Sequence, residues 1–148
     1  MKGRYNMFTV ENNTILTDAV IRAAYKDRKE KNGDVVEHNT VTIIPDDEKI
    51  YDECAPAFKN VGKKYIPSWF KSKEYIKLKS LYNIPVMRND EEITFDEWLQ
   101  TGLVKGAKAK VRFVLKKEKD SDEFAGVVYP LAIKIYEDGE PLNVFEGM

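Results

Sequence analysis

Residues 107–116 alternate between apolar and basic side chains with Val114 as the only interruption, and no other feature of the sequence constrains the fold as strongly. Successive side chains of a β-strand point to opposite faces, so this period of two predicts a strand with one face packed on a core. The apolar face holds Ala107, Ala109, Val111, Phe113 and Leu115. The opposite face holds cations about 6–7 Å apart, namely Lys108, Lys110, Arg112 and Lys116. Such a row indicates either a solvated outer face or a surface that binds a polyanion.

Charge is segregated along the chain, although the 148 residues carry a net charge of −1. Residues 59–88 hold eight Lys or Arg and one acid, and residues 105–119 hold seven basic residues and one acid. Acids collect in residues 46–53, in residues 90–97 and after Lys134. Because the arrangement of charge matters more than its sum, we expect one basic and one acidic region on the same fold.

The length, with 43% hydrophobic and 11% aromatic residues, predicts a single globular domain spanning residues 1–148. A single cysteine, Cys54, excludes an intrachain disulfide and a zinc site built from several cysteines. The first residues lack the apolar stretch of a signal peptide, and no run is long enough to cross a bilayer. We therefore expect a soluble protein of the cytoplasm that carries no cofactor.

Periodicity and turn residues predict five strands, at residues 5–26, 35–44, 73–82, 107–117 and 125–136. The Asn-Gly pair within residues 29–34 predicts a turn, and Asp46 is the expected N-cap of a helix that starts after Pro45. Thr94 and Glu97 predict a capping box on a short helix. The pattern favours a mainly β fold, a five-stranded barrel of the OB type with one inserted helix and an additional short helix. The alternative is a ferredoxin-like sheet, whose β-α-β periodicity the sequence lacks.

Two strands and the segment before one of them combine cations with aromatic rings. This combination is typical of single-stranded nucleic-acid binding, because bases stack on rings while cations pair with phosphates. The candidate contacts are Lys63, Lys64, Trp69, Lys71, Lys73, Tyr75, Lys77, Lys79, Lys108, Lys110, Arg112, Lys116, Lys134 and Tyr136. Arg22 and Lys26 are weaker indications of the same surface. The alternative is that Trp69 and Phe70 fill the barrel while the lysines are solvated.

The last strand is expected to place Lys134 and Tyr136 on its outer side. Its core side is expected to hold Val127, Tyr129, Leu131, Ile133 and Ile135.

Residues suited to catalysis are few. His38 lies on a strand and is interpreted as a packed histidine, and Cys54 falls on the apolar stripe of a helix, so neither supports a nucleophile with its base. Acid clusters at residues 46–48 and 90–92 are compatible with a Mg²⁺-dependent nuclease, although helix caps and loops also explain them. We expect a protein that is not an enzyme and holds no metal.

Three stretches resemble the phage-encoded single-stranded-DNA-binding proteins with an OB fold. Residues 41–47 (VTIIPDD) resemble the passage from the second strand into a helix, and residues 106–111 (GAKAKV) resemble the start of the fourth strand. Residues 125–133 (AGVVYPLAI) and 138–142 (DGEPL) are similar to the last strand and terminal turn. The resemblance implies a protein that coats single strands in phage DNA replication and recombination with little sequence preference, in the host cell cytoplasm and often as a homodimer.

The same family usually carries an acidic C-terminal tail that recruits replication and recombination proteins. Residues 137–148 hold four acids and one aromatic residue, which is shorter than a typical tail. Partner binding through Phe145 and Glu146 is therefore a hypothesis. A second reading of the whole chain is a protein-interaction module whose basic face docks an acidic partner. Only DNA binding requires rings within that face, so Tyr75→Ala and Trp69→Ala discriminate between the two readings.

Overall fold

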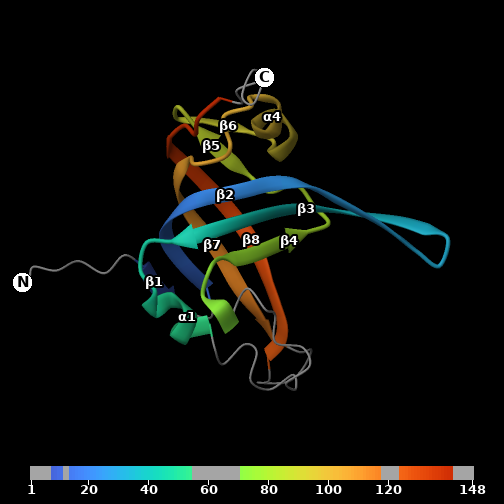
Figure 1. Cartoon of the computed structure of the whole chain (residues 1–148), viewed down its shortest axis with the longest axis horizontal. Coiled ribbons are helices and arrows are strands. Elements are labelled where there is room, and N and C mark those ends of the chain that lie inside the picture. The colour runs from blue at the N-terminus through green and yellow to red at the C-terminus, as the bar shows by residue number, and fades with distance from the viewer. Residues whose placement is uncertain (1–7, 12–13, 55–70, 118–123, 142–148) are drawn as a thin grey trace, which may run out of the picture.

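The computed structural model describes residues 8–11, 14–54, 71–117 and 124–141. Eight strands form one sheet with the order β4-β3-β2-β7-β8-β5-β6, and β1 pairs with β2 outside this path (Figure 1). The strands are β1 (Phe8–Glu11), β2 (Thr14–Lys31), β3 (Asp34–Pro45), β4 (Ile76–Ser80), β5 (Val86–Arg88), β6 (Glu91–Ile93), β7 (Lys108–Lys117) and β8 (Phe124–Glu137). Two short helices lie in the described part of the chain, α1 (Lys49–Cys54) and α4 (Phe95–Gln100).

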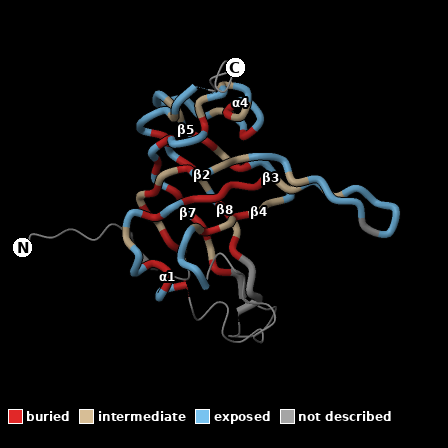
Figure 2. The backbone as a smooth tube through the Cα atoms, in the orientation of Figure 1, coloured by how far each residue is buried: buried red, intermediate tan, exposed pale blue. Residues whose placement is uncertain are grey.

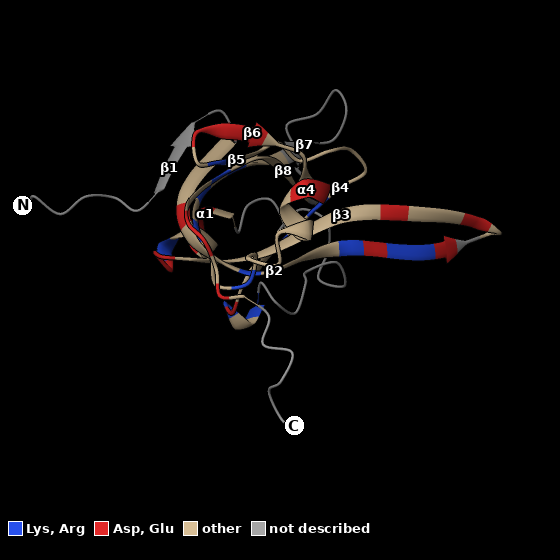
Figure 3. Ribbon diagram, turned by 90° about the horizontal axis from the view of Figure 1, so that it is seen from above, with Lys and Arg blue, Asp and Glu red and all other residues tan. Residues whose placement is uncertain are grey.

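The predicted mainly β architecture is confirmed, but the predicted five-stranded barrel is not. The sheet curls strongly (Figure 3), and β4 comes into contact with β8. No hydrogen-bonded ladder joins β4 to β8 within the described residues, so the sheet is open there. The open side of β8 pairs instead with β5, which forms a hairpin with β6. This hairpin was not predicted from the sequence, and its turn residues Asn89 and Asp90 both adopt positive φ.

Strand β2 holds the sheet together because its two halves pair with different neighbours. Residues 14–20 pair with β7, and residues 19–31 pair with β3, with a register shift between Ile21 and Ala23. The far part of the β2–β3 hairpin projects from the body as an exposed arm (Figure 2). The strands run through most of the predicted loop at 29–34. Only Asn32 and Gly33 form the turn, both with positive φ, as an Asn-Gly hairpin turn requires.

The core lies on the inner side of the curled sheet. The five residues of the predicted apolar face, Ala107, Ala109, Val111, Phe113 and Leu115, are all buried, which confirms the predicted orientation of that strand. The rings of Phe95 and Trp98 meet edge to face, with centroids 5.9 Å apart. The predicted capping box holds α4 in place: the Glu97 N–H donates to Thr94 Oγ1 at 3.1 Å, and the Thr94 N–H donates to Glu97 Oε1 at 3.0 Å.

Two local predictions were wrong. Helix α1 begins at Lys49, and its capping carboxylate belongs to Asp47, whose Oδ1 accepts the Lys49 N–H at 3.0 Å, so Asp46 is not the cap. On β8, Leu131 is 42% exposed and not in the core. The β7–β8 register shifts between Arg112 and Phe113, opposite the Pro130 region, and this shift reverses the alternation of faces. Ile133 and Ile135 are buried as predicted.

Candidate nucleic-acid interface

The outer face of β2, β3 and β4 brings together rings and cations from strands far apart in sequence. Cross-strand register places Ala23, Thr42 and Lys77 in one row, and Tyr25, Thr40 and Lys79 in the next. Residues directly opposite each other share a face of the sheet. We call the surface that these rows carry the β2–β4 face and define it by Arg22, Tyr25, Tyr75, Lys77 and Lys79.

Long side chains cover the middle of this face. Thr40 and Thr42 alternate along β3 with the core residues Val41 and Ile43, so they belong to the outer side of the sheet. They are nevertheless 0% and 2% exposed. The threonine row is therefore a closed floor, and the longer side chains beside it form the outer surface.

The guanidinium of Arg22 lies over the ring of Tyr75, with its Cζ 4.1 Å from the ring centroid. Arg22 directly follows the core residue Ile21, so alternation along β2 places it on the outer side. A guanidinium plane and an aromatic ring are both surfaces on which a nucleobase stacks. The pair is a preformed stacking platform on the β2–β4 face.

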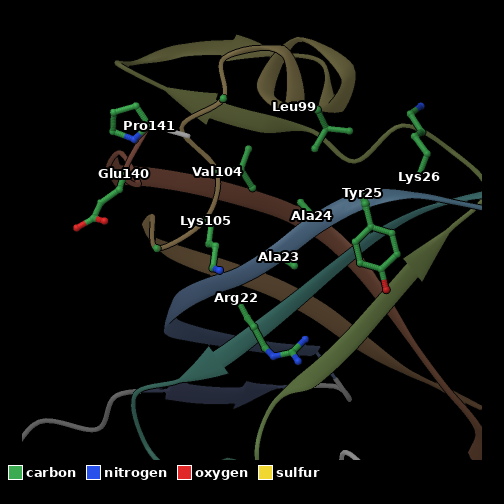
Figure 4. A pocket seen from close by; sticks show the side chains of 12 residues that line it. Arg22, Ala23, Ala24, Tyr25, Lys26, Leu99, Val104, Lys105, Glu140 and Pro141 are labelled. Atoms are coloured by element: carbon green, nitrogen blue, oxygen red, sulfur yellow. The ribbon is translucent and has the colours of Figure 1, made fainter. Parts of the chain in front are cut away.

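A groove of about 1120 Å³ continues the β2–β4 face along the free edge of β2 (Figure 4). The pairing of β2 with β7 and the turn before it ends near Ile21. The Ile21 N–H donates to the Ala107 carbonyl, and the Ile21 carbonyl accepts the Gly106 N–H, both at 2.8 Å. We call this space the edge groove. Its lining comes from residues 22–26 on one side and from residues 99–106, Glu140 and Pro141 on the other. Arg22, Lys26 and Lys105 give it three cations against one acid, Glu140.

Ion pairs neutralise some of these cations but not all. Lys79 Nζ lies 3.5 Å from Asp27 Oδ2, and Lys26 pairs with Asp96 and, at 3.8 Å, with Glu37. Lys77 and Lys105 form no ion pair with the residues that the structure describes. Lys77 is half-buried.

The basic row of β7 lies on a different part of the sheet surface. Lys110 is directly opposite Lys134 on β8, and Arg112 is opposite Ala132. These three cations line a hollow of about 280 Å³, which we call the β7–β8 hollow. The predicted set of contacts is thus divided between two surfaces.

Acids neutralise the end of this second surface. Lys108 Nζ lies 3.4 Å from Glu137 Oε2. Tyr136 is 54% exposed, and partial burial together with the charges of Asp18, Asp46 and Glu137 raises the pKa of its hydroxyl. A ring beside carboxylates is poorly placed to receive a phosphodiester, so Lys108 and Tyr136 are the weakest members of the predicted set.

The remaining predicted contacts precede β4 or fall outside the description. Lys71 and Lys73 are exposed, and Lys73 Nζ lies 3.8 Å from Asp52 Oδ1. Lys63, Lys64 and Trp69 lie outside the described residues. Lys116 belongs to β7, but its side chain is not described.

Two residues of the interface were missed from sequence, Tyr25 and Lys105. Simple alternation put Tyr25 on the side opposite Arg22, and the register shift at residues 21–23 moves Tyr25 to the outer side that Arg22 occupies. Lys105 lies in the turn before β7, where no periodicity applies. The Gly106 that follows it adopts a φ of 87°, and this glycine was the available signal for a tight turn.

No group of three or more His, Cys, Asp or Glu side chains in the described part of the chain is arranged to hold a metal ion. Burial raises the pKa of the Cys54 thiol to about 12, so this group is not a nucleophile near neutral pH. Burial also raises the pKa of the neighbouring Tyr51 to about 12. No described helix is long and apolar enough to cross a membrane.

Comparison with known proteins places the fold. No family model and no curated protein sequence matches the chain. Among solved structures, the single-stranded DNA-binding protein from bacteriophage Enc34 in complex with ssDNA matches with a TM-score of 0.60 and 14% identity, over 95% of this chain and 96% of that chain. Its C-terminal truncation matches with a TM-score of 0.57, 15% identity and coverages of 94% and 95%. The predicted resemblance to phage single-stranded-DNA-binding proteins is therefore confirmed at the level of the fold.

Proposed function

We propose that this protein is a non-enzymatic single-stranded-DNA-binding protein that holds DNA on the β2–β4 face. The observation that carries the proposal is the Arg22–Tyr75 platform beside Lys77 on one exposed face. Bases stack on such a platform, and the ammonium groups take the phosphates. The shared fold with the Enc34 protein, solved in complex with ssDNA, supports the same class of ligand.

The position of the face supports the proposal independently. OB folds are partly open five-stranded barrels that bind oligonucleotides on the face of their second and third strands. We take β2, β3, β4, β7 and β8 as the counterparts of those five strands, which makes β3 and β4 the second and third. The edge groove then extends the binding path beyond the platform.

In this proposal the contacts are stacking and phosphate pairing, so binding depends little on base sequence. The protein is phage-encoded, works in the cytoplasm of the infected cell and coats strands exposed in replication and recombination. The homodimer and the replication and recombination partners implied by the resemblance stay predictions.

Fluorescence anisotropy tests the function. A labelled single strand of about 30 nucleotides and the matching duplex are titrated with protein over a series of salt concentrations. We expect tight single-strand binding whose log affinity falls with log salt by about 0.7 per neutralised phosphate, and much weaker duplex binding. Absence of single-strand binding at low salt contradicts the proposal and favours the alternative, an acidic protein partner.

A charge reversal tests the face. Lys77→Glu is expected to weaken single-strand binding for all sequences alike and to lower the salt slope by about one contact, because it removes a phosphate partner. Lys49→Glu is the matched control, since Lys49 is an exposed cation on α1 outside the β2–β4 face and the edge groove. Equal affinities of the two variants count against the assigned face.

A further inference from the structure

The β7–β8 hollow lies on the outer surface where β8 runs between β7 and β5. Its volume of about 280 Å³ is just below the range of typical small-molecule sites, which begins near 300 Å³. The hollow therefore accommodates one small group. It is lined by Leu16, Pro85, Val86, Met87, Glu92, Lys110, Arg112, Ala132, Ile133 and Lys134.

The cations around the hollow form no ion pair with the residues that the structure describes. Lys110 and Lys134 are directly opposite each other on β7 and β8, an arrangement of like charges that destabilises a sheet. Neither residue, nor Arg112, forms an ion pair with any described residue, although Glu92 lines the hollow and Asp18 is opposite Lys110 on β2. An anionic group bound between these three cations relieves the repulsion.

The floor of the hollow is apolar and partly open to solvent. Met87 is 37% exposed, and Leu16 and Ala132 also line the hollow. Methionine sulfur makes favourable contacts with aromatic rings and adapts its shape to them. A ligand that fits has a flat aromatic body and one anionic group, which is the chemistry of a single nucleotide.

We propose that the β7–β8 hollow holds one further nucleotide of the same DNA strand that occupies the β2–β4 face. This inference rests on the proposed function. Leu16 at the hollow and Arg22 at the platform are six residues apart on β2, which is about 20 Å. Strands of up to about 16 nucleotides bind a single OB fold, so one strand has the length to reach both sites. The bound DNA then bends around β2.

Oligonucleotide length separates the two sites. The wild type, Arg112→Gln and Ala132→Leu are titrated with oligothymidines of about 6 and about 25 nucleotides. Arg112→Gln is expected to weaken binding of the long strand about tenfold, because a charged hydrogen bond to phosphate is lost, and to change binding of the short strand less than twofold. Ala132→Leu fills the hollow without removing charge, so it is expected to weaken only the long strand and to keep the salt slope.

The other possible results contradict either the second subsite or the proposed function. Equal loss at both lengths means that the hollow belongs to the primary site, and no loss with either variant means that DNA does not enter it. Both results contradict the second subsite and leave the proposed function standing. A wild type that binds neither oligonucleotide contradicts the proposed function itself. Unchanged thermal midpoints of the variants establish that the fold is intact.

Discussion

Replacing Tyr75 with alanine removes the ring of the stacking platform and leaves its charges in place. Stacking of a base on an aromatic side chain contributes about 1–3 kcal/mol. Part of this gain is offset, because a base that displaces Arg22 from the ring gives up a cation–π contact of about 0.5–1 kcal/mol. Taking the middle of each range, we therefore expect Tyr75→Ala to cost about 1.3 kcal/mol of binding free energy, or about an eightfold increase in Kd.

Anisotropy titration with a single strand of about 30 nucleotides measures this change, and a salt series identifies its origin. The salt slope of Tyr75→Ala is expected to match that of the wild type, because a stacked base neutralises no phosphate. Tyr75→Phe keeps the ring and is the matched control, with a Kd expected within about twofold of wild type. Wild-type affinity in a folded Tyr75→Ala protein refutes the assignment of the platform.

Three further predictions concern stability. Gly139→Ala is expected to lower the thermal midpoint by several degrees, because its Cβ would press against the Lys105 carbonyl, and overpacking costs about 1–3 kcal/mol. Trp98→Ala is expected to cost about 3–5 kcal/mol in urea unfolding. Trp98→Phe is expected to cost less than half as much, because the buried indole N–H has no hydrogen-bond partner in the described structure. The Arg88 guanidinium holds the pKa of Asp138 below 3.8, so this pair stabilises the fold above about pH 4 and the contribution is lost as pH falls through the lowered pKa. The stability difference between wild type and Asp138→Asn, followed by urea unfolding from pH 6 to pH 2, is expected to shrink toward low pH.

Local patterns in the sequence predicted what depends on near neighbours. The alternation at 107–115, the capping box at Thr94 and the Asn32-Gly33 turn all appear in the structure, because each is decided within a few residues. The length of the β2–β3 hairpin was underestimated, because the charged residues near its turn resemble those of a loop. Pairing along β2 and β3 nevertheless extends each strand to the turn.

The features that the sequence did not predict depend on residues that are far apart in the chain. The register shift on β2 moved Tyr25 to the outer side, and only pairing with β3 reveals such a shift. The sequence pattern predicted an unpaired cation at Lys108. In the structure, β8 places Glu137, which is 29 positions later in the chain, next to Lys108. Lys79 likewise meets Asp27 across β3. Periodicity shows which face a side chain shares, but the counter-charge comes from the tertiary fold.

The double pairing of β2 also predicts the order in which the chain folds. The β2–β3 ladder closes at Lys31 and Asp34 across a two-residue turn, whereas the β2–β7 ladder joins Thr14 to Val114, 100 positions away. Closing the longer loop costs more chain entropy, so we expect the β2–β3 hairpin to form first and the β2–β7 pairing to follow. Pulse-labelling hydrogen exchange during refolding is expected to protect amides of residues 22–31 before those of β7. Simultaneous protection would mean that the two halves of β2 assemble in one concerted step.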